Sequence, residues 1–116
     1  MTERKKIAIL ACLKANDVCA GASCLRALEE RKAAFSVYNG QQVYLCAFAR
    51  CSVCGKHLED DLGMQEKLER MISEGVSVVH IGVCAMLEDR ITSCPYMVEK
   101  ASWLEEHGLK VVWGTH

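Results

Sequence analysis

Residues 7–12 read Ile7-Ala8-Ile9-Leu10-Ala11-Cys12, an apolar run that follows a charged segment. Three further short, largely apolar runs follow along the chain, at 43–48, 76–84 and 111–113. A continuous apolar run is typical of a β-strand covered on both faces, whereas a strand with one solvated face alternates apolar and polar residues. The sequence therefore predicts four buried strands over these ranges.

Each gap between two of these runs carries the pattern of an amphipathic helix. Residues 22–33 form the first candidate, and the second repeats apolar residues at helical spacing over 64–72 and stops before Gly75. The third begins at Pro95, which suits a first helical position, and ends before Gly108, which suits a left-handed C-cap. Strands and helices therefore alternate along the whole chain.

Such alternation favours right-handed crossovers and a parallel sheet between two helical layers. At 116 residues, 51% of them hydrophobic, the chain is long enough for one core and too short for two ordinary domains. We therefore expect a single α/β domain over residues 1–116, a three-layer αβα fold with about four parallel strands in the flavodoxin-like or Rossmann-like order 2-1-3-4. Residues 35–38, just before the turn signal Asn39-Gly40, are expected to add a short edge strand.

Charge and hydropathy exclude several classes of partner. The formal net charge is −1 with acidic and basic residues interspersed, so no broad basic surface predicts binding to nucleic acid or to an anionic membrane. The apolar run at 7–12 is too short for a signal-peptide core or a membrane span. The sequence thus predicts a cytoplasmic protein.

The chain contains eight cysteines, and in a reducing compartment cysteines serve metal or redox chemistry more often than disulfides. Cys46 lies within the second apolar run and is interpreted as a small buried hydrophobe. The others fall at strand ends or in the loops that follow, which meet at one edge of a parallel sheet. The predicted metal-ligating residues are Cys12, Cys19, Cys24, Cys51, Cys54, Cys84, Cys94 and His116.

Cys51 and Cys54 form a C-x-x-C pair whose spacing lets both sulfurs turn to the same side of a loop. Neighbouring thiolates repel one another, so a bound cation is needed to hold them together. The residual negative charge of such a site would be offset by basic residues in the same loops, namely Lys14, Arg50, Lys56 and Arg90. Zinc prefers four sulfur or nitrogen ligands, which Cys51, Cys54 and Cys84 with either Cys12 or His116 would supply.

Iron–sulfur clusters also take cysteine ligands, and seven cysteines exceed what one zinc ion needs. The surplus favours a cluster, two metal sites, or one site plus a redox pair, so zinc and an iron–sulfur cluster remain equally favoured. A cluster would transfer electrons or sense oxidation, and a zinc ion with an open position would activate water or a thiol.

The alternative is a metal-free thiol–disulfide oxidoreductase that uses Cys51 and Cys54 with a redox partner protein. Against it, a thioredoxin-type motif opens its helix at once, whereas residues 55–61 intervene here before the second helix. A phosphate loop at Cys12 would need an arginine a few residues further on, and none is present before Cys19. No nucleotide-binding or zincin motif occurs either.

Two histidines near these cysteines have simpler interpretations. His80 lies inside the third apolar run, where a core imidazole is favoured over a role in orienting Cys84. His57 follows the C-x-x-C pair and is interpreted as a solvated loop residue.

Several segments together resemble one known family. They are Asp17-Val18-Cys19-Ala20-Gly21-Ala22-Ser23-Cys24, Phe35, Tyr38, Cys51-Ser52-Val53-Cys54-Gly55, residues 80–84, Cys94-Pro95 and Gly114-Thr115-His116. The chain resembles the CGGC domain family, described as a metal-binding domain rich in cysteine and histidine, over nearly its whole length. The resemblance implies metal binding through these cysteines. Ser52 and Val53 stand at the two central glycines of the namesake motif, which keeps the sulfur spacing and stiffens the loop.

Overall fold

The computed structural model describes residues 5–14, 19–82, 84 and 94–115. Along the chain the strands and helices are β1 (Lys5–Ala11), α1 (Ala22–Glu30), the 3₁₀ helix η2 (Ala33–Tyr38), β2 (Val43–Arg50), the 3₁₀ helix η3 (Leu58–Asp60), α2 (Leu62–Ser73), β3 (Val78–Ile81), α3 (Pro95–Glu106) and β4 (Lys110–Trp113). Within these residues no helix is both long and apolar enough to cross a membrane.

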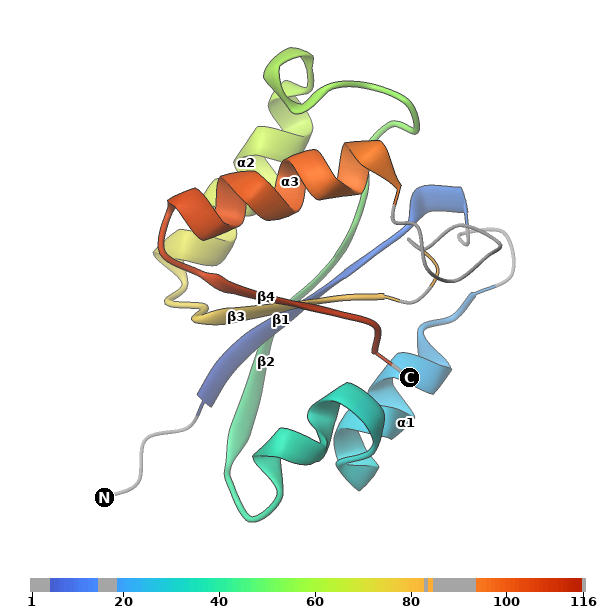
Figure 1. Ribbon diagram of the computed structural model, residues 1–116, viewed down its shortest axis with the longest axis vertical. Coiled ribbons are helices and arrows are strands. Elements are labelled where there is room, and N and C mark those ends of the chain that lie inside the picture. Colours follow the sequence, from blue (N-terminus) through green and yellow to red (C-terminus); the bar gives the residue numbers. More distant parts are fainter. Residues whose placement is uncertain (1–4, 15–18, 83, 85–93, 116) are drawn as a thin grey trace.

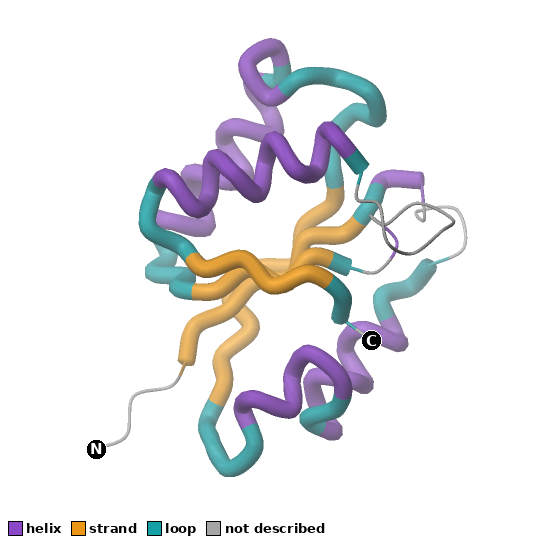
Figure 2. Tube along the Cα trace, viewed as in Figure 1, coloured by secondary structure: helices purple, strands orange, loops and turns teal. Residues whose placement is uncertain are grey.

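The strands form one sheet in the order β2-β1-β3-β4, and every neighbouring pair is parallel. Helices α2 and α3 cover one face of the sheet, and α1 with η2 covers the other (Figure 1, Figure 2). The predicted three-layer α/β architecture and its strand order are thus confirmed.

Strand β1 is the centre of this arrangement, because it pairs with both β2 and β3. Ile7 and Ile9 point into the core that faces α1, whereas Ala8 and Leu10 point into the core that faces α2 and α3, and all four are 0% exposed. This two-sided burial is the reason why the segment reads as an unbroken apolar run.

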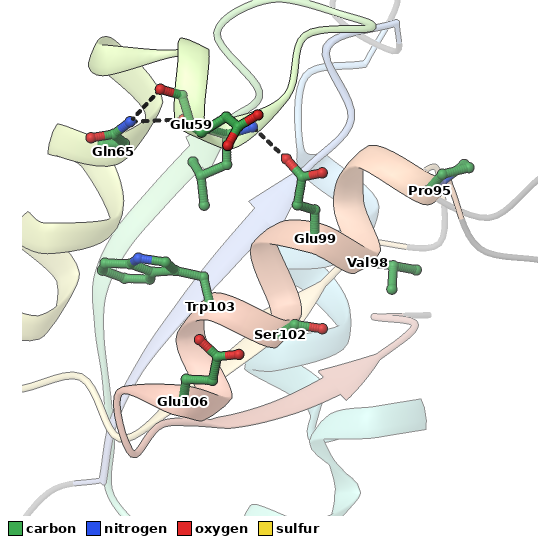
Figure 3. A pocket seen from close by; sticks show the side chains of 9 residues that line it. Glu59, Gln65, Pro95, Val98, Glu99, Ser102, Trp103 and Glu106 are labelled. Atoms are coloured by element: carbon green, nitrogen blue, oxygen red, sulfur yellow. Dashed lines mark hydrogen bonds between the residues drawn. The ribbon is translucent and has the colours of Figure 1, made fainter.

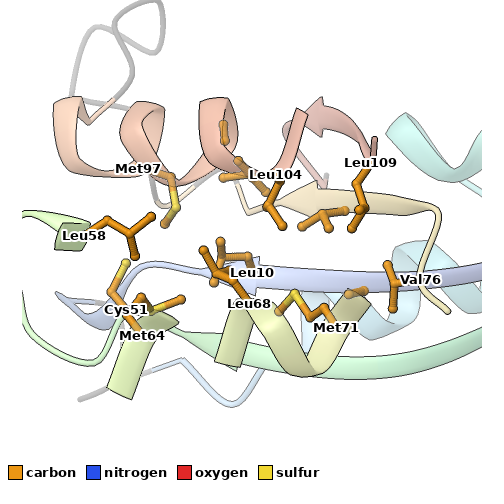
Figure 4. Close-up of a cluster of buried hydrophobic side chains, with 14 residues drawn as sticks. Leu10, Cys51, Leu58, Met64, Leu68, Met71, Val76, Met97, Leu104 and Leu109 are labelled. Carbon is orange, nitrogen blue, oxygen red and sulfur yellow. The ribbon is translucent and has the colours of Figure 1, made fainter. Parts of the chain in front are cut away.

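The larger core lies between the sheet and the helices α2 and α3. Figure 4 shows Leu10 of β1 and Leu68 of α2 within it, and Leu104 of α3 belongs to the same cluster. Cys51 lies at one end of this cluster, beside Leu58 and Met64 in the figure. The layer formed by α2 and α3 is therefore packed against the segment that carries the C-x-x-C pair.

The predicted edge strand over residues 35–38 is wrong, because η2 (Ala33–Tyr38) is a 3₁₀ helix. Phe35 and Tyr38 are 0% and 4% exposed and pack in the same core cluster. Residues three apart share a face in a 3₁₀ helix but lie on opposite faces of a strand, so burying both aromatic rings together selects the helix.

Two predicted boundaries also extend too far. The first helix stops at Glu30 rather than residue 33, because Arg31 adopts a left-handed conformation with φ 56°. The third strand covers only Val78–Ile81 of the predicted 76–84, which are the residues that pair with both β1 and β4.

His80 is a core residue, as its position in the sequence predicts. Its side chain is 0% exposed, its Nε2 atom lies 2.7 Å from the Tyr38 hydroxyl oxygen, and its ring centroid lies 4.5 Å from that of Phe35. The Nδ1 atom has no hydrogen-bond partner among the residues that the structure describes. Burial, with a smaller contribution from the charge of Lys110, lowers the pKa of His80 to about 4.

We expect acid to destabilise the fold through His80. Its folded pKa lies below the unfolded value, so the neutral imidazole stabilises the fold above about pH 6.5, and this stabilisation is lost as the pH falls toward 4. The loss should reach about 3 kcal/mol, measured as the free energy of unfolding in urea at pH 7, 5 and 4.

His80→Gln should flatten this pH dependence, because a glutamine side chain does not titrate. His107→Gln, at an exposed histidine, is the matched control for the loss of one imidazole. Equal pH slopes for the native chain and His80→Gln would contradict the assignment.

Candidate functional site

The carboxyl ends of the strands and the loops that follow them form the edge at which cysteines gather. Cys12 follows β1, Cys51 follows β2, and Cys94 is the N-cap residue of α3. Cys54 lies in the loop after β2, Cys84 lies beyond β3, and Cys19 and Cys24 lie just before and inside the first turn of α1. All seven described cysteines that the sequence assigns to this edge are free thiols there, whereas His116 lies outside the described residues.

A small cavity of about 20 Å³ lies at this edge, between the end of β1, the loop after β2 and the start of α3. Its cysteines are Cys12, Cys51, Cys54 and Cys94. Leu13, Val53, Tyr96 and Met97 supply most of the remaining wall, and Lys100 is the one charged side chain among the described residues that line it. The structure thus brings together four thiols from three separate segments.

The other three cysteines form a second group next to α1. Cys24 is buried, and its Sγ atom lies 3.0 Å from the Thr115 hydroxyl oxygen. Cys84 connects the two groups, because the Cys12 backbone N–H donates to its Sγ atom at 3.2 Å. None of these three lines the cavity.

The four cavity thiols surround the space without converging on one point. Among the residues that the structure describes, no three cysteine, histidine, aspartate or glutamate side chains are placed closely enough to hold one ion. Coordination of an ion would therefore require the side chains to move inward.

Cys51 is the thiol most affected by the protein environment of the cavity. Burial raises its pKa, the positive charge of Lys100 opposes that effect, and the neighbouring thiols of Cys12 and Cys94 raise the pKa further. Burial likewise raises the pKa of Cys84. In the absence of a metal ion these two sulfurs are therefore neutral thiols at neutral pH.

Cys19 has the opposite electrostatic environment. The Gly21 backbone N–H donates to its Sγ atom at 3.3 Å, and the Arg50 guanidinium donates to its carbonyl oxygen at 2.9 Å. The Gly21 hydrogen bond and the nearby Arg50 side chain lower the pKa of the Cys19 thiol. This sulfur carries more thiolate character than those of the buried cysteines.

His57 is an exposed loop residue, as expected from the sequence, and it also tethers the loop after the C-x-x-C pair to α3. Its Nδ1 atom lies 2.9 Å from a Glu99 carboxylate oxygen, and the other oxygen of Glu99 accepts a hydrogen bond from the Leu58 backbone N–H. The carboxylate raises the pKa of His57, and the same pairing lowers the pKa of Glu99. The loop is thus anchored at residues 57–58.

Sequence reasoning missed Lys100, which is 1% exposed and lines the cavity. The signal was present, because Lys100 lies three residues after Met97 and four before Leu104, on the buried face of α3. The cations expected from the loops are placed differently: Lys14 and Lys56 are exposed, Arg50 bonds to the Cys19 carbonyl, and Arg90 lies outside the described residues.

A larger groove, of about 760 Å³, lies between η3, α2 and α3, and none of the described residues that line it is a cysteine. Figure 3 shows that Glu59, Glu99 and Glu106 line it together with Trp103. Its carboxylates are spread along the groove, and Glu99 is already paired with His57. We therefore take the smaller cavity as the candidate site, because its cysteine thiols can bind a metal ion, although the groove is larger.

Comparison with known proteins gives one match. A family model described as the CGGC domain matches residues 6–116, which is nearly the whole chain. No curated protein and no solved structure gives a significant match.

The contrasting thiol environments predict an order of reactivity in the reduced, metal-free protein. At pH 7.5, iodoacetamide should modify Cys19 faster than Cys51 and Cys84, because the thiolate is the nucleophile and burial disfavours it at the other two. Mass spectrometry of peptides over a time course measures the three rates.

Arg50→Gln should slow the modification of Cys19, since it removes the positive charge beside that sulfur. Lys67→Gln, at an exposed lysine whose ammonium also bonds to the Arg50 carbonyl, is the control. Faster labelling of Cys51 than of Cys19 would refute the predicted order.

Proposed function

The chain belongs to the CGGC domain family, and from that premise we propose that it is a metal-binding protein whose ion is held by cysteine thiolates at the carboxyl edge of the sheet. The proposed ligands are Cys12, Cys51, Cys54 and Cys94. The observation that carries the proposal is that these four thiols line one small cavity, next to a buried ammonium group.

The donor set fits a thiophilic metal. Four cysteine sulfurs suit a tetrahedral zinc ion, and cysteine is also the usual ligand of iron–sulfur clusters. The C-x-x-C spacing of Cys51 and Cys54 is common in zinc sites, where the other two ligands come from elsewhere in the chain. Here Cys12 and Cys94 would supply them, from the end of β1 and the start of α3.

The size of the cavity favours a single ion over a cluster. A volume of about 20 Å³ exceeds the roughly 10–15 Å³ that one water molecule needs, but it leaves no room for several iron and sulfide atoms. We therefore propose zinc, which when bound would provide either a closed structural site or a Lewis acid. A cluster would require a much larger expansion of this edge.

Closure of the site would require Cys54 to move inward together with the side chains of the other three thiols. Cys54 and Gly55 are exposed, and Gly55 has φ +83°, so this part of the loop is not packed into the core. Cys51 at one end is packed in the larger core, and His57 at the other end is held by Glu99. Movement of the short segment between these anchors would bring Cys54 toward the cavity, and the side chains of Cys12, Cys51 and Cys94 would also have to turn inward.

The metal-free oxidoreductase is less well supported than metal binding. An attacking cysteine needs a lowered pKa, which C-x-x-C enzymes achieve at a helix N-terminus. Burial instead raises the pKa of Cys51, and the next helical segments begin only at Leu58 and Leu62. A divalent ion would reverse this, because coordination deprotonates a thiol outright.

The cysteines that do not line the cavity are not proposed as ligands. Cys84 accepts the Cys12 N–H and thereby positions the first ligand, whereas Cys19 and Cys24 form the group beside α1. Eight free thiols fit a reducing compartment, and we propose the cytoplasm.

Metal content tests the proposal directly. The reduced protein, purified anaerobically, should contain one equivalent of zinc and no visible absorption, measured by elemental analysis and ultraviolet–visible spectroscopy. Zinc at 100 times its dissociation constant should raise the free energy of unfolding by about 2.7 kcal/mol. Iron with sulfide and visible charge-transfer bands would instead show a cluster, and a metal-free protein under zinc-replete conditions would contradict the proposal.

Single substitutions test the ligand set. Cys51→Ser and Cys54→Ser should each abolish stoichiometric zinc, because a serine hydroxyl stays protonated and is a poor zinc ligand. Cys46→Ser, in the middle of β2, is the matched control and should retain it. Retention of full metal content by Cys51→Ser would show that the ligands were wrongly chosen.

A further inference from the structure

Lys100 is an unusual residue for the interior of a small domain. Its side chain is 1% exposed, among the largest fully buried side chains of the described residues. A charged lysine is almost never fully buried unless an anion or several hydrogen bonds compensate it.

Within the described part of the chain, the ammonium group of Lys100 has few partners. The Lys100 Nζ atom donates to the Tyr96 carbonyl oxygen at 3.2 Å, and its positive charge counteracts the rise that burial causes in the pKa of the Cys51 thiol. None of the ion pairs between described residues includes Lys100. Among the described residues, the polar groups that line the cavity beside this ammonium are thiols rather than carboxylates.

The fold delivers this charge to the cavity by way of α3. Lys100 shares the buried face of that helix with Met97, Ala101 and Leu104, so its methylene stem packs in the core while its head reaches the cavity. The same helix carries Cys94 at its N-cap, and the Met97 backbone N–H donates to the Cys94 carbonyl at 3.0 Å. A thiol and a cation are thus fixed relative to each other by one rigid element.

The charge of a thiolate-bound metal site explains why an ammonium group would lie beside it. Four thiolates around one divalent ion leave two negative charges in a cavity walled largely by apolar side chains. Such charge is costly to desolvate unless a cation lies close by. A buried ammonium has the converse need for an anion.

We propose that Lys100 is the built-in counter-ion of the thiolate site, a positioning residue that cancels part of its negative charge and so strengthens metal binding. This inference rests on the proposed function. It assigns to one residue the role of setting the affinity of the site without coordinating the ion.

The competing role is purely structural, in which the ammonium stabilises α3 through its bond to the Tyr96 carbonyl. The two roles predict opposite effects of replacing Lys100 on the stability of the metal-free protein. If Lys100 serves the site, its replacement by an apolar residue of similar length removes a buried charge that no described carboxylate pairs with, and leaves the metal-free fold at least as stable. If it serves the helix, the same replacement destabilises the metal-free fold.

The test compares Lys100→Met with the native chain and with Lys32→Met, a control that removes one positive charge from a lysine whose side chain is 70% exposed. Zinc affinity is measured by competition with a chelator, and the stability of the metal-free, reduced protein by urea unfolding. Lys100→Met should weaken zinc binding roughly 10- to 100-fold, the range seen when an outer-shell partner of a metal ligand is lost. It should leave the urea midpoint of the metal-free protein equal or higher, and Lys32→Met should keep the native affinity.

Each outcome decides between the roles. If the native chain takes up no zinc, the proposed function itself fails. If the native chain binds zinc and Lys100→Met binds it equally tightly, the counter-ion role is overturned while metal binding stands. Lys100→Gln provides a second uncharged variant, and loss of the metal-free fold in both would assign Lys100 to the structural role.

Discussion

Burial of β1 on both of its faces is the constraint on which the rest of the structure depends. Here the strand that is covered on both faces is flanked by parallel strands, and parallel strands need connections that cross over the sheet, in this fold as helices. Ile7 and Ile9 face one helical layer and Ala8 and Leu10 the other, so neither layer can be removed without exposing apolar surface. The same crossovers bring the ends of β1, β2 and β3 to one edge, and that edge is where the thiols gather.

The cysteines at this edge can act in two ways, according to whether the thiol is protonated or deprotonated. As a neutral thiol, cysteine packs like a small hydrophobe, and Cys24 and Cys51 each belong to one of the two cores. As a thiolate, it is a strong ligand for soft metals. Cys51 combines both properties, because it closes the end of the larger core and also lines the cavity. The metal-free fold is therefore compatible with a site that an ion would complete.

Two buried titratable groups show how differently the interior treats charge. His80 is kept neutral by burial, and the Tyr38 hydroxyl satisfies one of its ring nitrogens. Lys100 instead faces the thiols of the cavity, which can themselves become anions. The neutral His80 packs in the core that faces α1, whereas the position of Lys100 beside the thiols is the basis of the inferred counter-ion. Their difference lies in their neighbours, since both side chains are almost fully buried.

The sequence by itself determined the layers, the strand order and the edge at which seven cysteines lie, because continuous apolar runs and helical periodicity are local signals that burial imposes on each segment. It did not determine η2, since a short run such as 35–38 carries no period long enough to separate a strand from a 3₁₀ helix. Only the tertiary structure divided the thiols into the cavity group and the group beside α1, placed Lys100 in the cavity, and paired His57 with Glu99 across 42 residues. Those facts depend on which helix face meets which loop, and such contacts are set by the packing of distant segments rather than by the spacing of residues within one.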